Sequence, residues 1–172
     1  MAEIKRLRRV LILCIHCARN AIFYRQGWKG KKPMFGGQLL ITANSNFLDI
    51  AVLEWCKLFA DPKGKHHWTK VVPDRTAFEC AFLTDLSLGP DELEAFIKNV
   101  RQYRDRFLAH LDDDEKMNIP NLDIIIASVS FLYQHLMSHE AKGLVHDGDA
   151  TLNGNISAWS RDAKDFYQRN HT

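Results

Sequence analysis

The segment "YRDRFLAHLDDD", residues 103–114, places two arginines, a histidine and four carboxylates around a short apolar run. Histidine titrates near neutral pH, so His110 could remove a proton from an RNA 2′-hydroxyl group. The planar fork of an arginine could hold the neighbouring phosphate and offset the charge that builds up on it. This chemistry needs no metal ion, and it makes Arg104 and His110 the candidate catalytic pair.

The spacing of this pair leaves its geometry open. Six residues along an ideal α-helix leave two side chains about 120° apart, whereas Arg106 and His110, four apart, share a face. Arg104 could still reach His110 through its long side chain, through distortion at the helix end, or across a two-fold dimer contact. We treat Tyr103, Asp105 and Arg106 as supporting candidates. In the alternative interpretation, both arginines are surface charges paired with acids, and His110 is a helix-end histidine.

The apolar residues that must position this segment recur with helical spacing along nearly the whole chain. They predict helices at about 3–24, 38–59, 74–86 and 90–111, and a fifth helix that ends near His139. A loop over 142–155 and a short amphipathic helix from Ser157 follow, and no segment shows the alternation of a strand. We therefore predict a single all-α domain over residues 1–172, a bundle of four main helices with additional short helices.

The helix ends carry recognisable signals. Pro90, followed by Asp91 and Glu92, predicts the first turn of a helix, because proline suits that position and acids favour the positive end of the helix dipole. Pro120 in "NIPNLD" is predicted to begin the fifth helix in the same way. The acidic run over residues 112–115 is unfavourable near a helix C-terminus, so the preceding helix should end by about Leu111.

Charge is unevenly distributed although the net charge is only +2. Residues 1–32 hold nine Lys or Arg and one acid, a balance of +8, and the remaining residues balance at −6. Such asymmetry favours an anionic partner, and the alternative is a solvated basic helix face. The candidate contacts to RNA phosphates are Lys5, Arg6, Arg8 and Arg9.

No apolar run approaches the roughly 20 residues that a membrane span requires. The start of the chain is basic and then apolar, but His16 and Arg19 interrupt the apolar part, which argues against a signal peptide. We therefore expect a cytoplasmic protein with no membrane segment.

The cysteines and histidines are the residues that could bind a soft metal ion. Cys14, Cys17, Cys56 and Cys80 lie in apolar helical contexts, which predicts reduced, buried thiols. Cys14 and Cys17 lack a second ligand pair at zinc-site spacing, so we expect neither a metal nor a cofactor. His66 and His67 precede Trp68 in a loop, where they could contact a ligand or RNA or, alternatively, help to pack the loop.

Three segments together resemble the HEPN superfamily of helical domains, and most closely its abortive-infection, U-type branch. They are "RDRFLAHLDDD", "LFADPKGKHHWTKVV" over 58–72 and "PNLDIIIASVSFLYQHL" over 120–136. The resemblance covers roughly residues 38–139, which leaves 140–172 as a C-terminal loop and short helix. Arg104, Asp105 and His110 match the family motif of an arginine, a polar residue and a later histidine.

This resemblance implies a metal-independent endoribonuclease of toxin or phage-defence type. It also implies a homodimer with paired motifs at its interface, and a partner such as an antitoxin. Some members of the superfamily do not cut RNA and serve as binding modules. The alternative function is therefore a non-catalytic helical module that binds a partner protein or a nucleotide.

Overall fold

The predicted all-α class is confirmed. The computed structural model describes residues 2–109, 118–140 and 152–170, with the side chains of Ala2 and of residues 107–109 left undescribed. Two strands of two residues each are the only strands in these ranges. The α-helices are α1 (Ala2–Gln26), α2 (Gln38–Trp55), α3 (Arg75–Leu86), α4 (Pro90–Tyr103), α5 (Leu122–His139) and α6 (Leu152–Arg169).

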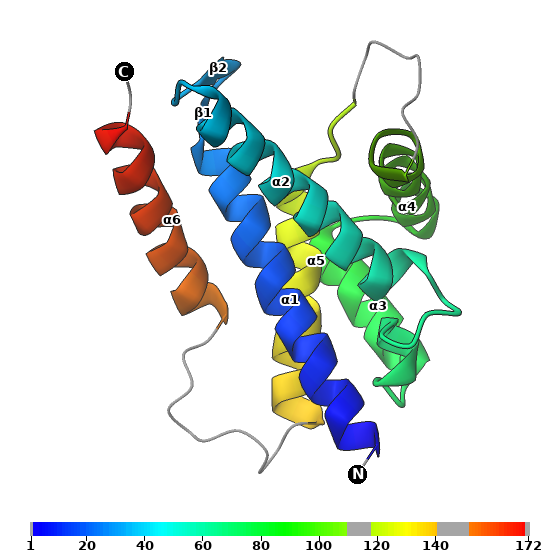
Figure 1. Ribbon diagram of the computed structural model, residues 1–172. Coiled ribbons are helices and arrows are strands. Elements are labelled where there is room, and N and C mark those ends of the chain that lie inside the picture. Colours follow the sequence, from blue (N-terminus) through cyan, green and yellow to red (C-terminus); the bar gives the residue numbers. More distant parts are fainter. Residues whose placement is uncertain (1, 110–117, 141–151, 171–172) are drawn as a thin grey trace.

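Helix α1 is central to the fold. It packs against α2, α5 and α6, which surround it in Figure 1. Its inward stripe combines aliphatic residues with small ones, and small side chains allow the helix axes to approach closely. The fully buried members of this stripe are Val10, Cys14, Cys17, Ala18, Ala21 and Ile22. The range 38–139 suggested by the family resemblance therefore omits a helix that fills the middle of the core.

The glycine-rich segment after α1 contains a small hairpin where only a loop was expected. Strand β1 (Trp28–Lys29) pairs antiparallel with β2 (Lys32–Pro33). Gly30 in the turn has a φ of 61°, a left-handed conformation that glycine adopts without steric cost. The hairpin is too short to show the alternating pattern by which strands are recognised in a sequence.

The prediction of a short C-terminal helix was wrong. Helix α6 has 18 residues, as many as α2 and α5, and begins inside the segment that was expected to be a loop. Gly154 and Asn153 have low helix propensity, but each costs the helix only about 1 kcal/mol or less relative to alanine. The helix is held by an apolar stripe on one face, formed by Leu152, Ile156, Trp159, Ala163 and Tyr167.

The two helix starts that contain proline differ. Pro90 occupies the first turn of α4 as predicted, and the Glu92 carboxylate accepts a 2.7 Å hydrogen bond from the Gly89 N–H. Pro120, however, lies before α5 rather than in its first turn. Asn121 is the N-cap, and its side-chain oxygen accepts a 2.9 Å hydrogen bond from the Asp123 N–H.

Two π-helical segments replace α-helix where continuous helices were predicted. The first, η1 (Cys56–Ala60), extends α2, and the second, η3 (Arg104–Ala109), extends α4. Such segments widen the helical turn and are frequent at functional sites. Helix α4 packs against η1, so the two modified helix ends lie close together.

None of the described helices combines the length and apolar composition required to cross a lipid bilayer.

Candidate functional site

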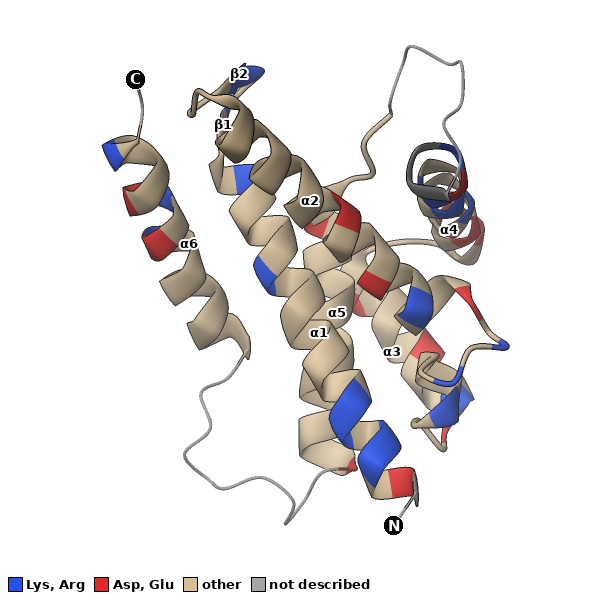
Figure 2. Ribbon diagram, viewed as in Figure 1, with Lys and Arg blue, Asp and Glu red and all other residues tan. Residues whose placement is uncertain are grey.

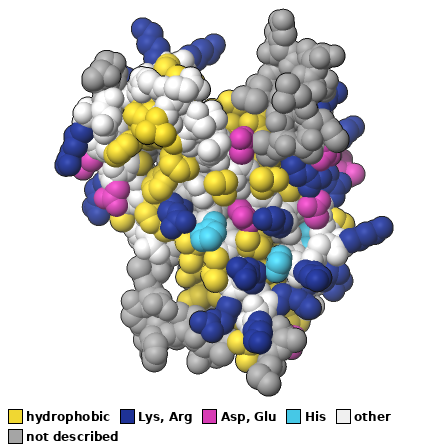
Figure 3. All heavy atoms as spheres, viewed as in Figure 1, with side chains coloured by type: hydrophobic (Ala, Val, Ile, Leu, Met, Phe, Trp, Pro, Cys, Tyr) yellow, Lys and Arg dark blue, Asp and Glu magenta, His cyan; other side chains and the backbone are white. Residues whose placement is uncertain are grey.

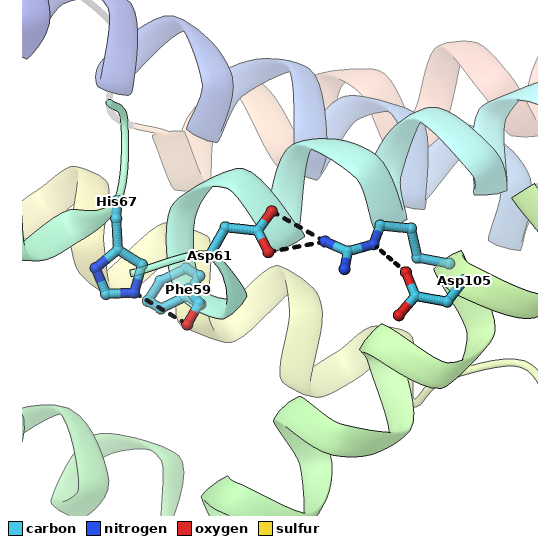
Figure 4. A network of polar contacts seen from close by, with 5 residues as sticks. Phe59, Asp61, His67 and Asp105 are labelled. Carbon is cyan, nitrogen blue, oxygen red and sulfur yellow. Dashed lines mark hydrogen bonds and ion pairs between the residues drawn. The ribbon is translucent and has the colours of Figure 1, made fainter. Parts of the chain in front are cut away.

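Arg104 is held between two carboxylates from different parts of the chain. Its Nη1 donates to both oxygens of Asp61 at 2.9 Å, and its Nε donates to Oδ1 of Asp105 at 2.8 Å (Figure 4). The Arg104 side chain is only 22% exposed. Hydrogen bonds to Asp105, and then to Asp61, raise the pKa of the guanidinium despite the opposing effect of burial, so it stays charged.

The two π-helical segments set this geometry. Arg104 is the first residue of η3, and Asp61 follows directly after the last residue of η1. The Arg104–Asp61 ion pair therefore joins the end of α4 to the end of α2. The hydrogen bonds of Arg104 within the described ranges are made by Nη1 and Nε, so Nη2 is a further N–H donor group that could bind a ligand.

The three supporting candidates have different environments. Asp105 forms a 2.8 Å ion pair with Arg104. The Arg106 side chain is exposed. Tyr103 is only 2% exposed, and its hydroxyl donates a hydrogen bond to the Asp49 carboxylate on α2. Burial and the adjacent Asp49 charge raise the pKa of Tyr103, so its hydroxyl stays protonated at neutral pH.

His110 and the acids at 112–115 lie outside the described residues. The contact between Arg104 and His110 therefore stays a prediction. Within the described part, Arg104 has acidic partners, as the surface-charge interpretation also expects.

The basic candidates on α1 are exposed and adjoin a second basic segment. Lys5, Arg6, Arg8 and Arg9 occupy the N-terminal end of α1, and Figure 2 shows further basic residues on the segment that follows α2. His66 belongs to this surface: burial lowers its pKa, and the positive charges of Arg9 and Lys57 lower it further. In Figure 3, Lys, Arg and His side chains gather on the lower part of the face in view.

His67 packs the loop and is buried, with 5% exposure. Its Nε2 donates to the Phe59 carbonyl oxygen at 3.1 Å, and its Nδ1 accepts from the Thr69 hydroxyl at 2.9 Å. Burial lowers the pKa of His67, so the neutral ring is favoured. The adjacent Trp68 stacks on Phe78 with ring centroids 4.7 Å apart. These contacts agree with the packing interpretation of this loop.

Three of the four cysteines are buried as predicted, but Cys80 is exposed on α3. Cys80 lies on the outward side of this helix, whose buried residues are Phe78 and Phe82. Burial raises the pKa of Cys56 to about 12, and the opposing effect of the Arg104 charge is smaller. This thiol therefore stays protonated. The described residues contain no group of three His, Cys, Asp or Glu side chains placed to hold a metal ion.

Two residues of this region were not found by sequence reasoning. Asp61, which is 43 residues before Arg104 in the chain, forms an ion pair with it. Asp49, on the earlier helix α2, accepts a hydrogen bond from Tyr103. Neither belongs to a short motif with its partner, and only the packing of α4 against η1 and of α2 against η3 brings them together. Asp61 does lie within the 58–72 segment that contributes to the family resemblance.

A search of family models, of curated proteins and of solved structures finds no match to this chain. The fold and the site therefore define an all-α protein with an anchored arginine at the junction of two π-helical segments.

Proposed function

We propose that this chain is a HEPN-like, metal-independent endoribonuclease of toxin or phage-defence type. The observation that carries the proposal is the position of Arg104. The arginine of the motif begins a π-helical segment, and two carboxylates fix its guanidinium while Nη2 is left to donate. A fixed, charged donor suits the stabilisation of a phosphate in the transition state, because it needs little reorganisation during the reaction.

In the proposed reaction, His110 removes the proton from an RNA 2′-hydroxyl, and the 2′-oxygen attacks the adjacent phosphorus. The bond from phosphorus to the 5′-oxygen breaks, and that oxygen takes the proton that His110 removed from the 2′-hydroxyl, so His110 acts first as base and then as acid. The products are a 2′,3′-cyclic phosphate and a 5′-hydroxyl. Arg104 offsets the added charge on the phosphate oxygens, and Asp61 and Asp105 hold Arg104 in place.

The RNA backbone would run over the basic surface of α1. Lys5, Arg6, Arg8 and Arg9 are exposed there, and Lys57 and His66 extend this surface towards the loop that begins at Asp61. Contacts to phosphates carry no sequence information, so they would give affinity and positioning rather than a choice of target.

We further propose a cytoplasmic homodimer that is held inactive by an antitoxin or another protein partner. Support comes from large apolar side chains that α1 and α2 leave exposed, which are Ile4, Ile12, Leu39, Ile41, Ile50 and Leu53. Association with another protein would remove these apolar side chains from water, which favours an interface at this surface.

The test is to incubate the purified protein with end-labelled RNA in EDTA and to identify the product termini. We expect cleavage that EDTA does not inhibit, with 2′,3′-cyclic phosphate ends. Arg25→Ala is a matched control, because it removes an exposed arginine from an ion pair of 2.7 Å with Asp123 and should leave cleavage unchanged. Cleavage that requires a divalent cation, or that yields 3′-hydroxyl ends, would rule out the proposed mechanism.

A non-catalytic interaction module is the second candidate. The ion pairs of Arg104 favour it, because an arginine that is already neutralised by two carboxylates also fits a purely structural role. A purified protein that binds a partner but never cuts RNA would make this the leading function.

A further inference from the structure

A pocket of about 600 Å³ lies on the side of Tyr103 that faces α2 and the β-hairpin. This volume is in the range of pockets that bind small organic molecules. Aromatic side chains form much of its wall, and the Tyr24 and Trp28 rings are 6.0 Å apart while Trp28 and Phe35 meet edge to face at 6.1 Å. The aromatic residues of the lining are Tyr24, Trp28, Phe35 and Tyr103.

The polar groups of this wall differ in how far their hydrogen-bonding capacity is used. The Asn44 side chain is occupied, because its amide donates to the Tyr24 carbonyl and to the Tyr167 hydroxyl and its oxygen accepts from the Trp28 indole at 3.0 Å. Asp49 is different, since Tyr103 is the one hydrogen-bond partner found for its carboxylate within the described residues. Asp49 therefore keeps acceptor capacity towards the pocket.

Among the described residues that line the pocket, the only charged side chain is that of Asp49. No lysine or arginine is among the described residues that line it, so the Asp49 carboxylate has no cation beside it in the lining. Burial raises the pKa of Asp49, and the hydrogen bond from Tyr103 opposes this effect but is smaller. The same charge also raises the pKa of the neighbouring Tyr24, after the larger effect of burial. A cation that entered the pocket would relieve this imbalance.

Aromatic faces and a carboxylate together favour a cation over an anion or a neutral ligand. The faces attract positive charge through the ring quadrupole, and a partly desolvated carboxylate attracts it more strongly than one in bulk water. We propose that this pocket binds an alkylammonium group, with the aromatic rings around its apolar body and Asp49 beside its charge. The pocket shares Tyr103 with the segment that contains Arg104, but it is a poor fit for an RNA phosphate, so the proposed cation site does not depend on the proposed RNA cleavage.

The alkylammonium group has two possible sources, a free small molecule or a lysine side chain of a partner protein. Choline represents the first and n-butylammonium, which matches the lysine side chain, the second. Each has a neutral counterpart of similar shape, 3,3-dimethylbutan-1-ol and 1-butanol respectively. Comparison within each pair removes the contribution of shape and apolar burial, so the difference reports the charge.

The experiment is an NMR titration of the full chain that follows the Trp28 indole N–H, assigned with Trp28→Phe. We expect at least one cation to bind about tenfold more tightly than its neutral counterpart. Preference in the choline pair indicates a small-molecule cation, and preference in the butylammonium pair indicates a lysine side chain. Equal affinity within both pairs, or no binding by either cation, would overturn the proposal. Both results are measured on the parental chain, and Trp28→Phe serves only to assign the indole signal.

Asp49→Asn tests the role of the carboxylate. The preference for the cation should fall to about equality, because the amide keeps the shape of the carboxylate without its charge. Asp85→Asn, which changes an exposed carboxylate of α3, is the matched control and should retain the preference. Circular dichroism is the measurement that checks whether both variants are folded. A folded Asp49→Asn protein with the parental preference would contradict the assignment of Asp49.

Discussion

The Nη1 atom of Arg104 lies 2.9 Å from both carboxylate oxygens of Asp61, and this contact ties the end of α4 to the end of α2. Side-chain exposures of 22% and 39% place the pair between a buried and a surface ion pair. Its contribution to stability should therefore be modest, since partial solvation weakens the attraction while the desolvation cost stays small. Its larger consequence is orientation, because the guanidinium has one preferred direction.

The first prediction concerns the strength of this pair. A double-mutant cycle with Arg104→Ala and Asp61→Ala should give a coupling free energy of about 0.5–1 kcal/mol, measured by urea unfolding. The same cycle on Arg25 and Asp123, an ion pair with side chains 41% and 80% exposed, should give a smaller value. A coupling for Arg104 and Asp61 that is no larger than in this surface pair would show that Asp61 does not fix the arginine.

The second prediction concerns pH and His67. Burial lowers its pKa in the folded state below the ordinary value of 6.5, so at lower pH the unfolded state binds more protons. The stability that the neutral ring contributes is complete above about pH 6.5 and is lost as the pH falls through the lowered pKa. We therefore expect the free energy of unfolding to decrease from about pH 7.5 to about pH 5.5.

His67→Gln tests this origin. Glutamine can still donate to the Phe59 carbonyl but does not titrate, so the variant should lose less stability over the same pH interval, as measured by chemical unfolding at each pH. Parallel pH profiles for the two proteins would show that His67 does not cause the acid sensitivity.

The third prediction concerns thiol reactivity. Cys14, Cys17 and Cys56 are fully buried, and burial raises the pKa of each, whereas Cys80 is exposed. A thiol reagent should therefore modify one cysteine per chain in the native protein and all four in denaturant. Cys80→Ser should reduce the native reaction to a slow background. Rapid modification of a second thiol in the native protein would mean that the packing of α1 against α2 opens easily.

Sequence reasoning reached the fold class and most helix boundaries because apolar periodicity is a local signal. Pro90 and the acids after it also give local signals, and the start of α4 was placed correctly. The length of α6 was missed because Gly154 and its neighbours suggest a loop, whereas Leu152 and Tyr167 hold the helix through tertiary contacts. Helix propensity predicts the ends of a helix poorly where packing against another helix stabilises the additional turns.

Only part of the candidate site could be predicted from the sequence, because some of its contacts join residues that are distant in the chain. Arg104 was found through a short motif, which lies within one helix end. Asp61 was not found, because ion pairs between distant residues leave no regular spacing in a sequence. The π-helical segments were also missed, since the apolar pattern of a single widened turn hardly differs from that of an α-helix.

The fourth prediction concerns the proposed homodimer. We expect Arg104→Ala and His110→Ala each to be inactive alone, and a mixture of the two to recover activity after subunit exchange. If each site takes its arginine and its histidine from different chains, each heterodimer contains one intact site. In an equimolar mixture after random exchange, about half of the dimers are heterodimers, and each has one intact site out of two. The recovered activity should therefore approach about a quarter of the parental rate. An inactive mixture that contains heterodimers would place both groups of a site on the same chain.

The most direct test of the account compares RNA cleavage by the parental chain, His110→Ala and three arginine variants. We expect His110→Ala and Arg104→Ala to abolish cleavage while circular dichroism shows unchanged helix content. Arg104→Lys should recover little, because lysine lacks the planar fork, and Arg106→Ala should matter less. Cleavage at the parental rate by both His110→Ala and Arg104→Ala would contradict the account and leave residues 103–114 as a charged helix end.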